Sequence, residues 1–200
     1  MSPIHQALKP SKILCVARNY VEHIKELDNE VPTQPAIFMK PSSAIADEIY
    51  FNALDSIHYE SELCFIIKDS KLSEVGFGLD LTKREIQSQL KAKGLPWERA
   101  KAFDGSAVFS TFVAFTGEVK DLRLELFIND ELVQQGGCEL MLYQPEEILS
   151  EIQSFCTLVD GDIIMTGTPK GVGEIHKNDK FVGKIFSKQD LLVEKLWIVK

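Results

Sequence analysis

The sequence predicts an α+β fold with one largely antiparallel or mixed β core. Short runs rich in Val, Ile and Phe, each bounded by turn residues, outnumber the segments with helical periodicity. The two kinds of segment do not alternate regularly, which argues against a doubly wound parallel sheet. Because a chain of 200 residues buries about 70% of its unfolded surface, this core needs no disulfide or structural metal. We expect a single catalytic domain over residues 1–200.

Eight runs have the composition of strands. In chain order they are Lys12–Ala17, Ala36–Lys40, Glu60–Ile67, Gly76–Leu81, Val108–Phe115, Arg123–Asn129, Asp162–Thr166 and Phe181–Ile185. Turn residues separate these runs, and no internal repeat or linker-like stretch divides the chain.

Three segments predict helices. The first spans Asn19–Leu27 with Asn19 as its cap. The second follows Thr82 and Glu85, which have the spacing of a capping box, and ends at Gly94. The third is Pro145–Phe155, where proline occupies its preferred place in the first turn.

Composition and charge exclude several classes of partner. A net charge of −8 without a basic stripe argues against nucleic acid. No apolar run approaches the roughly 18 residues of a membrane helix, and the first residues do not read as a signal peptide. The four cysteines are widely spaced and predict reduced thiols, with Cys138 as the candidate for exposure. We therefore expect a cytoplasmic protein.

Two glutamates stand at the head of the run Glu60–Ile67. Successive strand residues point to opposite faces, so Glu60 and Glu62 share a face and lie about 7 Å apart along the chain. Two carboxylates beside an apolar core repel each other unless a cation neutralises them. A polar strand end that faces solvent has the same spacing, so spacing alone leaves both interpretations open.

A third carboxylate, Asp80, lies just before the second predicted helix. Alone it is typical of a strand-to-helix turn. If it meets Glu60 and Glu62, the three form an all-oxygen site that selects Mg²⁺ or Mn²⁺ and leaves positions for a chelating substrate. His58 stands outside this pattern, and we leave it out of the predicted ligand set.

Two further patterns could carry chemistry. In the first predicted helix, His23 and Glu26 are spaced i, i+3, so the carboxylate can orient the imidazole as a general base. Exposed pairs of this kind are common on helix surfaces. The run Gly161–Gly173 is a strand that enters a loop rich in Gly and Thr, whose backbone N–H groups suit an anion. It lacks the G-K-[ST] ending of a P-loop, and a plain loop is the alternative.

Together these residues resemble the fumarylacetoacetate hydrolase family, in particular its short acylpyruvase-like branch. The resemblance covers about residues 12–184. Its motifs are Arg18-Asn19-Tyr20 with His23 and Glu26, Phe38-Met39-Lys40-Pro41-Ser42, Glu60-x-Glu62, Asp80 with Arg84 and Gln87, Pro96-Trp97, Lys101-x-Phe103 and Thr166–Gly173. Ala17 stands where the family usually has Gly, and Glu85 where it usually has Asp; neither change removes a ligand or the proposed base.

The resemblance implies a mixed, barrel-like β-roll, a homodimer, and a role for each matching residue. Glu60, Glu62 and Asp80 would bind Mg²⁺ or Mn²⁺, while His23 and Glu26 would activate water from a short helix that closes over the site. Lys101 would stand beside the metal. The implied substrate-binding residues are Arg18, Lys40, Arg84, Gln87 and Thr168.

The expected activity is hydrolysis of the C–C bond of an acylpyruvate, such as acetylpyruvate or fumarylpyruvate, with pyruvate enolate as the leaving group. The same enolate arises when oxaloacetate is decarboxylated, and keto–enol isomerisation of oxaloacetate or of a hydroxymuconate-type substrate needs only the metal and a proton shuttle. These reactions are the alternatives. A non-catalytic binding protein would carry a damaged ligand or base, and none is found. An iron dioxygenase would need two histidines near one carboxylate, but His5, His23 and His176 occupy unrelated segments.

Overall fold

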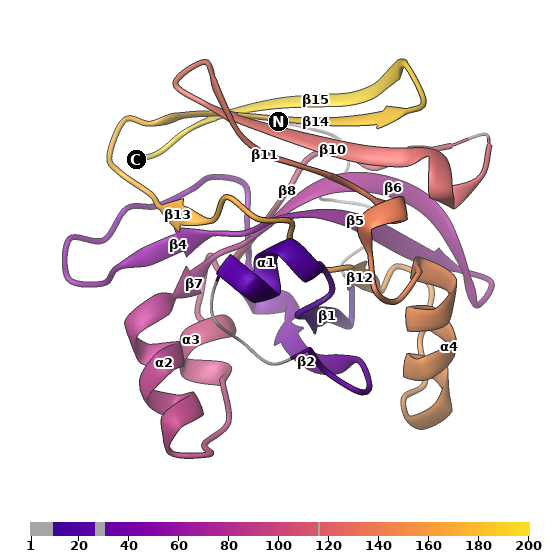
Figure 1. Cartoon of the computed structure of the whole chain (residues 1–200), viewed down its shortest axis with the longest axis horizontal. Coiled ribbons are helices and arrows are strands. Elements are labelled where there is room, and N and C mark those ends of the chain that lie inside the picture. Colours follow the sequence, from indigo (N-terminus) through magenta and orange to yellow (C-terminus); the bar gives the residue numbers. More distant parts are fainter. Residues whose placement is uncertain (1–9, 27–30, 116) are drawn as a thin grey trace.

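The computed structural model describes residues 10–26, 31–115 and 117–200, and it confirms the α+β class with a mixed sheet. Within these residues the largest sheet has eight strands in the order β2-β1-β12-β5-β6-β8-β3, with β9 paired to β6 (Figure 1). Only β1–β12 and β3–β8 are parallel pairs among them. The strands are β1 Lys12–Ala17, β2 Ala36–Pro41, β3 Ile45–Ala46, β5 Ser61–Lys68, β6 Lys71–Asp80, β8 Ala107–Phe109, β9 Val113–Ala114 and β12 Ile163–Met165.

Two smaller sheets complete the β structure of the described residues. A four-stranded antiparallel sheet packs across one face of the β5–β6 hairpin, and a three-stranded sheet lies at its end (Figure 1). The four-stranded sheet consists of β11 Glu131–Gly137, β10 Leu122–Ile128, β14 Lys180–Ser187 and β15 Asp190–Ile198. The small sheet consists of β13 Gly173–Glu174, β4 Ile57–Tyr59 and β7 Thr82–Lys83.

In Figure 1, helices α2 and α3 lie together at the lower left, α4 lies at the lower right, and α1 lies near the centre of the view. They are α1 Val21–Glu26, α2 Arg84–Ala92, α3 Glu98–Lys101 and α4 Pro145–Phe155, with 3-10 turns η1 Ser42–Ala44, η2 Val119–Asp121 and η3 Cys138–Leu140. Among the described residues, no helix is long and apolar enough to span a membrane.

Each predicted strand overlaps an observed strand, but some bounds differ and some strands were not predicted. The run Val108–Phe115 is two strands, because Ser110 leaves the ladder and its hydroxyl accepts a hydrogen bond from the Phe77 N–H at 2.9 Å. Strand β6 starts five residues earlier than predicted, at Lys71. Strands β11 and β15 were missed. The polar sequence of β11 does not read as a strand, which forms because β10 supplies its hydrogen-bond partners.

Two predicted helix caps are wrong. Thr82 lies in β7, where its hydroxyl accepts a hydrogen bond from the Lys101 ammonium at 2.6 Å, and helix α2 begins at Arg84. The Asn19 side chain does not cap α1 either: its amide donates to the carbonyl of Thr166 at 2.8 Å. The end of this helix predicted at Leu27 lies outside the described residues. The third helix, Pro145–Phe155, has the predicted bounds.

The β5–β6 hairpin separates two parts of the hydrophobic core. Phe65 and Phe77 on one face pack against the four-stranded sheet, while Cys64 on the other face packs with Cys15 of β1. The prediction that Cys138 is exposed was wrong: burial raises the pKa of its thiol to about 12. All four cysteines are free thiols.

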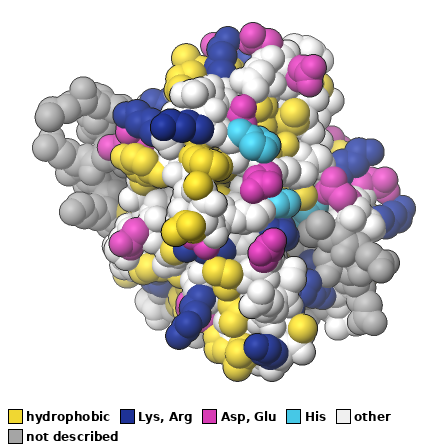
Figure 2. All heavy atoms as spheres, turned by 90° about the vertical axis from the view of Figure 1, so that its left-hand side faces the viewer, with side chains coloured by type: hydrophobic (Ala, Val, Ile, Leu, Met, Phe, Trp, Pro, Cys, Tyr) yellow, Lys and Arg dark blue, Asp and Glu magenta, His cyan; other side chains and the backbone are white. Residues whose placement is uncertain are grey.

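Charged side chains are mixed on the face seen in Figure 2, where Lys and Arg alternate with Asp and Glu rather than gathering in one patch. A protein that binds nucleic acid presents clustered Lys and Arg. This distribution fits the expectation that nucleic acid is not a partner, which stays a prediction.

Candidate metal centre and active site

The three predicted ligands converge because of the register of the β5–β6 hairpin. Its turn, Asp69-Ser70, has positive φ at both residues, as a tight two-residue hairpin requires. A bulge near Ile66 then shifts the pairing so that Ser61 faces Leu79. The Asp80 N–H donates to the Glu60 carbonyl at 2.8 Å, which places Asp80 beside Glu60 at the end of the hairpin.

The resulting cluster has the properties of a site for a hard divalent cation. Glu60, Glu62 and Asp80 are all buried, and one carboxylate oxygen from each lies within 4.8 Å of the others. Asp80 Oδ1 accepts no hydrogen bond within the described residues, although Lys40 Nζ lies 2.8 Å away as an ion pair. A set of three carboxylates that retains an unused oxygen matches the ligand preference of Mg²⁺ and Mn²⁺. Neither His58 nor any other described histidine belongs to the cluster.

Three basic side chains surround the carboxylates. Lys101 Nζ donates to Glu60 Oε2 and to Asp80 Oδ2, both at 2.7 Å. Arg84 pairs with the other oxygen of Glu60 and donates to Gln87 Oε1 at 2.8 Å. Lys40 is completely buried behind Asp80, where it also donates to the carbonyls of Lys101 and Ser106.

The surroundings shift the pKa values of Glu60 and Glu62 in opposite directions. Burial alone would raise the pKa of Glu60, but the charges of Lys101 and Arg84 outweigh it and hold that pKa well below the usual range. Burial and the neighbouring charge of Asp80 raise the pKa of Glu62 well above its ordinary value. A bound cation would oppose this rise, because it favours the ionised form of a carboxylate that ligates it.

Two glycines of the loop that follows β12 hold site carboxylates through their N–H groups. Gly167 donates to Glu62 Oε2 at 2.7 Å, and Gly171 donates to Glu26 Oε1 at 2.9 Å. Both have positive φ, and a Cβ at Gly171 would lie 2.0 Å from the Val133 carbonyl oxygen, so only glycine fits. The predicted anion-binding loop therefore binds carboxylates of its own chain.

The predicted His23–Glu26 pair forms in α1. His23 Nδ1 lies 3.0 Å from Glu26 Oε2, and the imidazole is buried rather than exposed. An ionised carboxylate only accepts hydrogen bonds, so Nδ1 carries the hydrogen and Nε2 is left to exchange a proton with a ligand. The bond from Gly171 fixes Glu26 from its other side.

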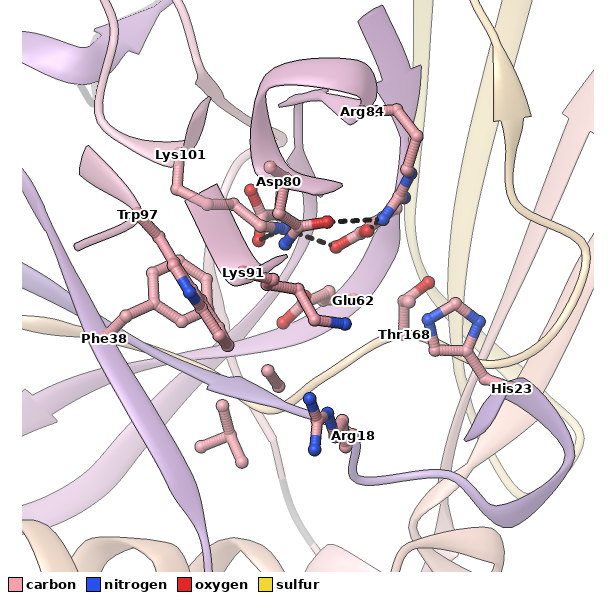
Figure 3. A pocket seen from close by; sticks show the side chains of 14 residues that line it. Arg18, His23, Phe38, Glu62, Asp80, Arg84, Lys91, Trp97, Lys101 and Thr168 are labelled. Atoms are coloured by element: carbon pink, nitrogen blue, oxygen red, sulfur yellow. Dashed lines mark hydrogen bonds and ion pairs between the residues drawn. The ribbon is translucent and has the colours of Figure 1, made fainter. Parts of the chain in front are cut away.

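A cavity of about 40 Å³ brings most of the predicted residues together (Figure 3). Among the predicted residues, those that line it are Arg18, His23, Glu60, Glu62, Asp80, Arg84, Gln87, Lys101 and Thr168. Lys40 and Glu26 do not line it; Lys40 contacts Asp80, and Glu26 contacts His23. Figure 3 shows His23 and Thr168 on one side of the cavity, opposite Phe38 and Trp97.

Sequence reasoning missed two residues of this region. Lys91 lines the cavity, and its signal was present: Arg84, Gln87 and Lys91 have i, i+3, i+7 spacing on one face of α2. Gln134 is buried in the unpredicted strand β11, where its amide donates to Thr168 Oγ1 at 2.9 Å and its carbonyl accepts from the Ser61 N–H at 3.0 Å. No local pattern in the sequence marks it.

Comparison with known proteins adds independent information. Residues 12–193 match the family described as fumarylacetoacetate (FAA) hydrolase C-terminal. The oxaloacetate tautomerase YcgM of Escherichia coli is 37% identical over 188 residues, which cover 85% of this chain and 86% of that protein. The human mitochondrial oxaloacetate tautomerase FAHD1 is 38% identical over 186 residues, 84% of each chain. The crystal structure of fumarylpyruvate hydrolase from Pseudomonas aeruginosa, in complex with Mn²⁺ and pyruvate, has a TM-score of 0.87 and 27% identity, and the match covers 96% of this chain and 90% of that chain.

The predicted acylpyruvate hydrolase activity is contradicted by these relatives. Curated relatives at 34–39% identity over most of the chain are oxaloacetate tautomerases, which the prediction had kept only as an alternative. The error has a physical reason. A histidine oriented by a carboxylate can move a proton on a carbon acid as well as activate water, so the His23–Glu26 pair is compatible with tautomerisation as well as with hydrolysis.

Proposed function

Because the chain belongs to the fumarylacetoacetate hydrolase family, we propose that it is a divalent-metal-dependent enzyme that interconverts the enol and keto forms of oxaloacetate. The observation that carries this proposal is the convergence of three carboxylates on a cavity that also contains His23. The tautomerase relatives support the same reaction.

The ion would be held by Glu60, Glu62 and Asp80. Bound there, Mg²⁺ or Mn²⁺ would act as a Lewis acid that stabilises negative charge on the 2-oxygen of the substrate. The solved relative in complex with Mn²⁺ and pyruvate supports a divalent cation beside a 2-oxo acid, and Mg²⁺ is the alternative ion.

In the proposed reaction His23 moves the proton. Starting from the keto form, Nε2 accepts a proton from C3, the C–H electron pair becomes the C2–C3 double bond, and the C2–O π pair moves onto the 2-oxygen. The imidazolium then delivers its proton to that oxygen, which gives the enol and restores the neutral imidazole. The reverse sequence returns the keto form. Glu26 holds Nδ1–H and stabilises the imidazolium that forms while the proton is on His23.

Charge at the cavity fits a substrate with two carboxylates. Three basic side chains already neutralise the three acids, so a divalent cation leaves an excess of positive charge for the substrate to offset. Burial and the nearby charges of Arg18 and Arg84 lower the pKa of Lys91, which means that these cations lie close enough to repel each other. A second carboxylate on the substrate would relieve that repulsion.

The remaining roles follow from position. We assign Thr168, Gln87 and Arg84 to the oxo and carboxylate groups of the substrate, with Arg18 at the edge of the cavity. Lys101 would offset charge beside the metal, and Lys40 would hold Asp80 in place. The homodimer and the cytoplasmic location stay predictions, and several of the relatives are named as mitochondrial.

The test is an assay of freshly dissolved oxaloacetate, in which loss of the enol is followed by its ultraviolet absorbance with Mg²⁺, with Mn²⁺ and after chelation. We expect acceleration that depends on the metal, without release of CO₂. Stoichiometric CO₂ and pyruvate would instead identify a decarboxylase. A rate equal to that of buffer with the same metal would exclude the proposed function.

A further inference from the structure

Two hollows of very different size are lined in part by Lys101, whose ammonium contacts Glu60 and Asp80. The first is the cavity of about 40 Å³ described above, whose lining is largely charged. The second is an apolar groove of about 580 Å³ between β2 and the segment 94–98, lined by Ala36, Ile37, Met39, Leu95 and Pro96 among others. Both hollows are lined by the same three residues: Phe38, Trp97 and Lys101.

The two aromatic rings form a wall between these hollows. The ring centroids of Phe38 and Trp97 are 5.9 Å apart at an angle of 55°. The Phe38 ring lies 5.1 Å from Lys101 Nζ, which itself contacts Glu60 and Asp80. The wall therefore stands directly beside the proposed metal site (Figure 3).

The backbone around Trp97 is well anchored. Its carbonyl accepts hydrogen bonds from the N–H groups of Ala100 at 2.8 Å and Lys101 at 3.0 Å, and the Leu95 N–H donates to the Leu90 carbonyl at 2.9 Å. These bonds tie the segment to both α2 and α3. The backbone that carries the indole is thus held by hydrogen bonds, and the ring itself packs against Phe38.

We propose that Trp97, packed against Phe38, is a specificity-determining residue that limits the site to short, polar 2-oxo acids. Apart from this wall the cavity is bounded mainly by charged and polar groups, so an alkyl chain would lie beside desolvated charges. An extensive apolar surface lies next to the site, in the groove on the far side of Trp97. The inference rests on the proposed function, since it explains why a site of this family would favour oxaloacetate over a 2-oxo acid with a long apolar chain.

Removal of the indole should join the two hollows. In Trp97→Ala the alkyl chain of 2-oxooctanoate could pass over Lys101 into the groove. Each buried methylene strengthens binding about fourfold, so the burial of two to three of them gives a gain of about 30-fold.

The experiment measures inhibition of oxaloacetate tautomerisation by 2-oxooctanoate in the Mn²⁺-loaded enzyme. The quantity compared is the inhibition constant divided by the KM for oxaloacetate, so that a general loss of activity cancels. We expect this ratio to fall about 30-fold in Trp97→Ala, to stay within about threefold of wild type in Trp97→Phe, and to stay unchanged in Leu95→Ala, which alters the groove but not the wall.

Two results would overturn the proposal: an unchanged ratio in a Trp97→Ala protein that melts cooperatively, or equal affinity of wild type and variant for 2-oxooctanoate. If wild type fails to tautomerise oxaloacetate, the proposed function is at fault. In that case, calorimetric titration of the Mn²⁺-loaded wild type and Trp97→Ala with pyruvate and with 2-oxooctanoate tests the role of Trp97 without an activity assay.

Discussion

Asp162 and the three acids of the carboxylate cluster are all buried at the ends of strands, but they differ in the groups that surround them. Asp162 Oδ1 accepts hydrogen bonds from Ser11 and from the Lys12 N–H, while Oδ2 accepts from the Lys12 ammonium at 2.6 Å and the Val159 N–H at 3.0 Å. One negative charge is thus saturated by donors of the same chain. Around Asp80, three carboxylates meet within 4.8 Å, and Asp80 Oδ1 has an ion pair with Lys40 at 2.8 Å as its contact to a charged group.

This difference distinguishes Asp162, which has a structural role, from the carboxylate cluster, which we propose binds a metal ion. Burial alone does not mark a functional site, because Asp162 is as buried as Asp80. What marks the site is the convergence of three carboxylates on one cavity, where burial and the neighbouring charge of Asp80 raise the pKa of Glu62. Three substitutions and one pH dependence test this distinction.

The largest effect should come from Asp80→Asn. We expect the loss of one metal ligand to abolish stabilisation by Mn²⁺ and to slow oxaloacetate tautomerisation at least about 10³-fold, because stabilisation of charge on the substrate is lost. Calorimetric titration with Mn²⁺ and the enol assay measure the two effects. The control is Glu194→Gln, which removes a half-exposed acid paired with Lys184 and should change neither. Normal Mn²⁺ binding by Asp80→Asn would show that the cluster is not the metal site.

Glu26→Gln should have the next largest effect. The amide cannot hold the imidazolium as a carboxylate does, so we expect activity to fall on the order of 10²-fold while Mn²⁺ affinity is unchanged. Glu22→Gln in the same helix, which loses only an exposed pair with Lys25, is the matched control. Activity near that of wild type would remove the pair from the mechanism.

Asp162→Asn should lower stability instead of activity. The substitution leaves the Lys12 ammonium without its partner and weakens several hydrogen bonds, which should cost about 2–4 kcal/mol of the free energy of unfolding. Urea unfolding at pH 7 measures this loss, with Asp190→Asn as an exposed control. Weaker Mn²⁺ binding in Asp162→Asn would contradict the separation of the two regions.

The smallest effect is the pH dependence of that stability. Burial would raise the pKa of Asp162, but its bonds to Lys12, Val159 and Ser11 outweigh burial and lower it. An acid with a lowered folded-state pKa stabilises the fold fully above its unfolded value of about 3.9, and this contribution is lost as pH falls through the folded-state pKa. The stability difference between wild type and Asp162→Asn should therefore be constant from pH 7 to about pH 5 and narrow below pH 4. If the stability difference between wild type and Asp162→Asn increased as the pH falls, the lowered pKa of Asp162 would be contradicted.

The sequence by itself determined the local parts of the site. Alternation along a strand places Glu60 and Glu62 on one face, and i, i+3 spacing brings His23 to Glu26, because each relation depends only on the geometry of one element. The third helix was predicted with its observed bounds for the same reason. The loop after β12 was found from its glycines, although its N–H groups bind Glu62 and Glu26 rather than a free anion.

Only the tertiary structure decided that Asp80 joins the two glutamates. The pairing Ile67–Leu72 becomes Ile66–Glu74 across the bulge, so β6 contains one extra residue there. Without it Glu60 would face Leu79, and Asp80 would point to the opposite side, because a shift of one residue exchanges the two faces of a strand. The bulge depends on how β6 fits its neighbours β5, β8 and β9, contacts that are distant along the chain and leave no local pattern.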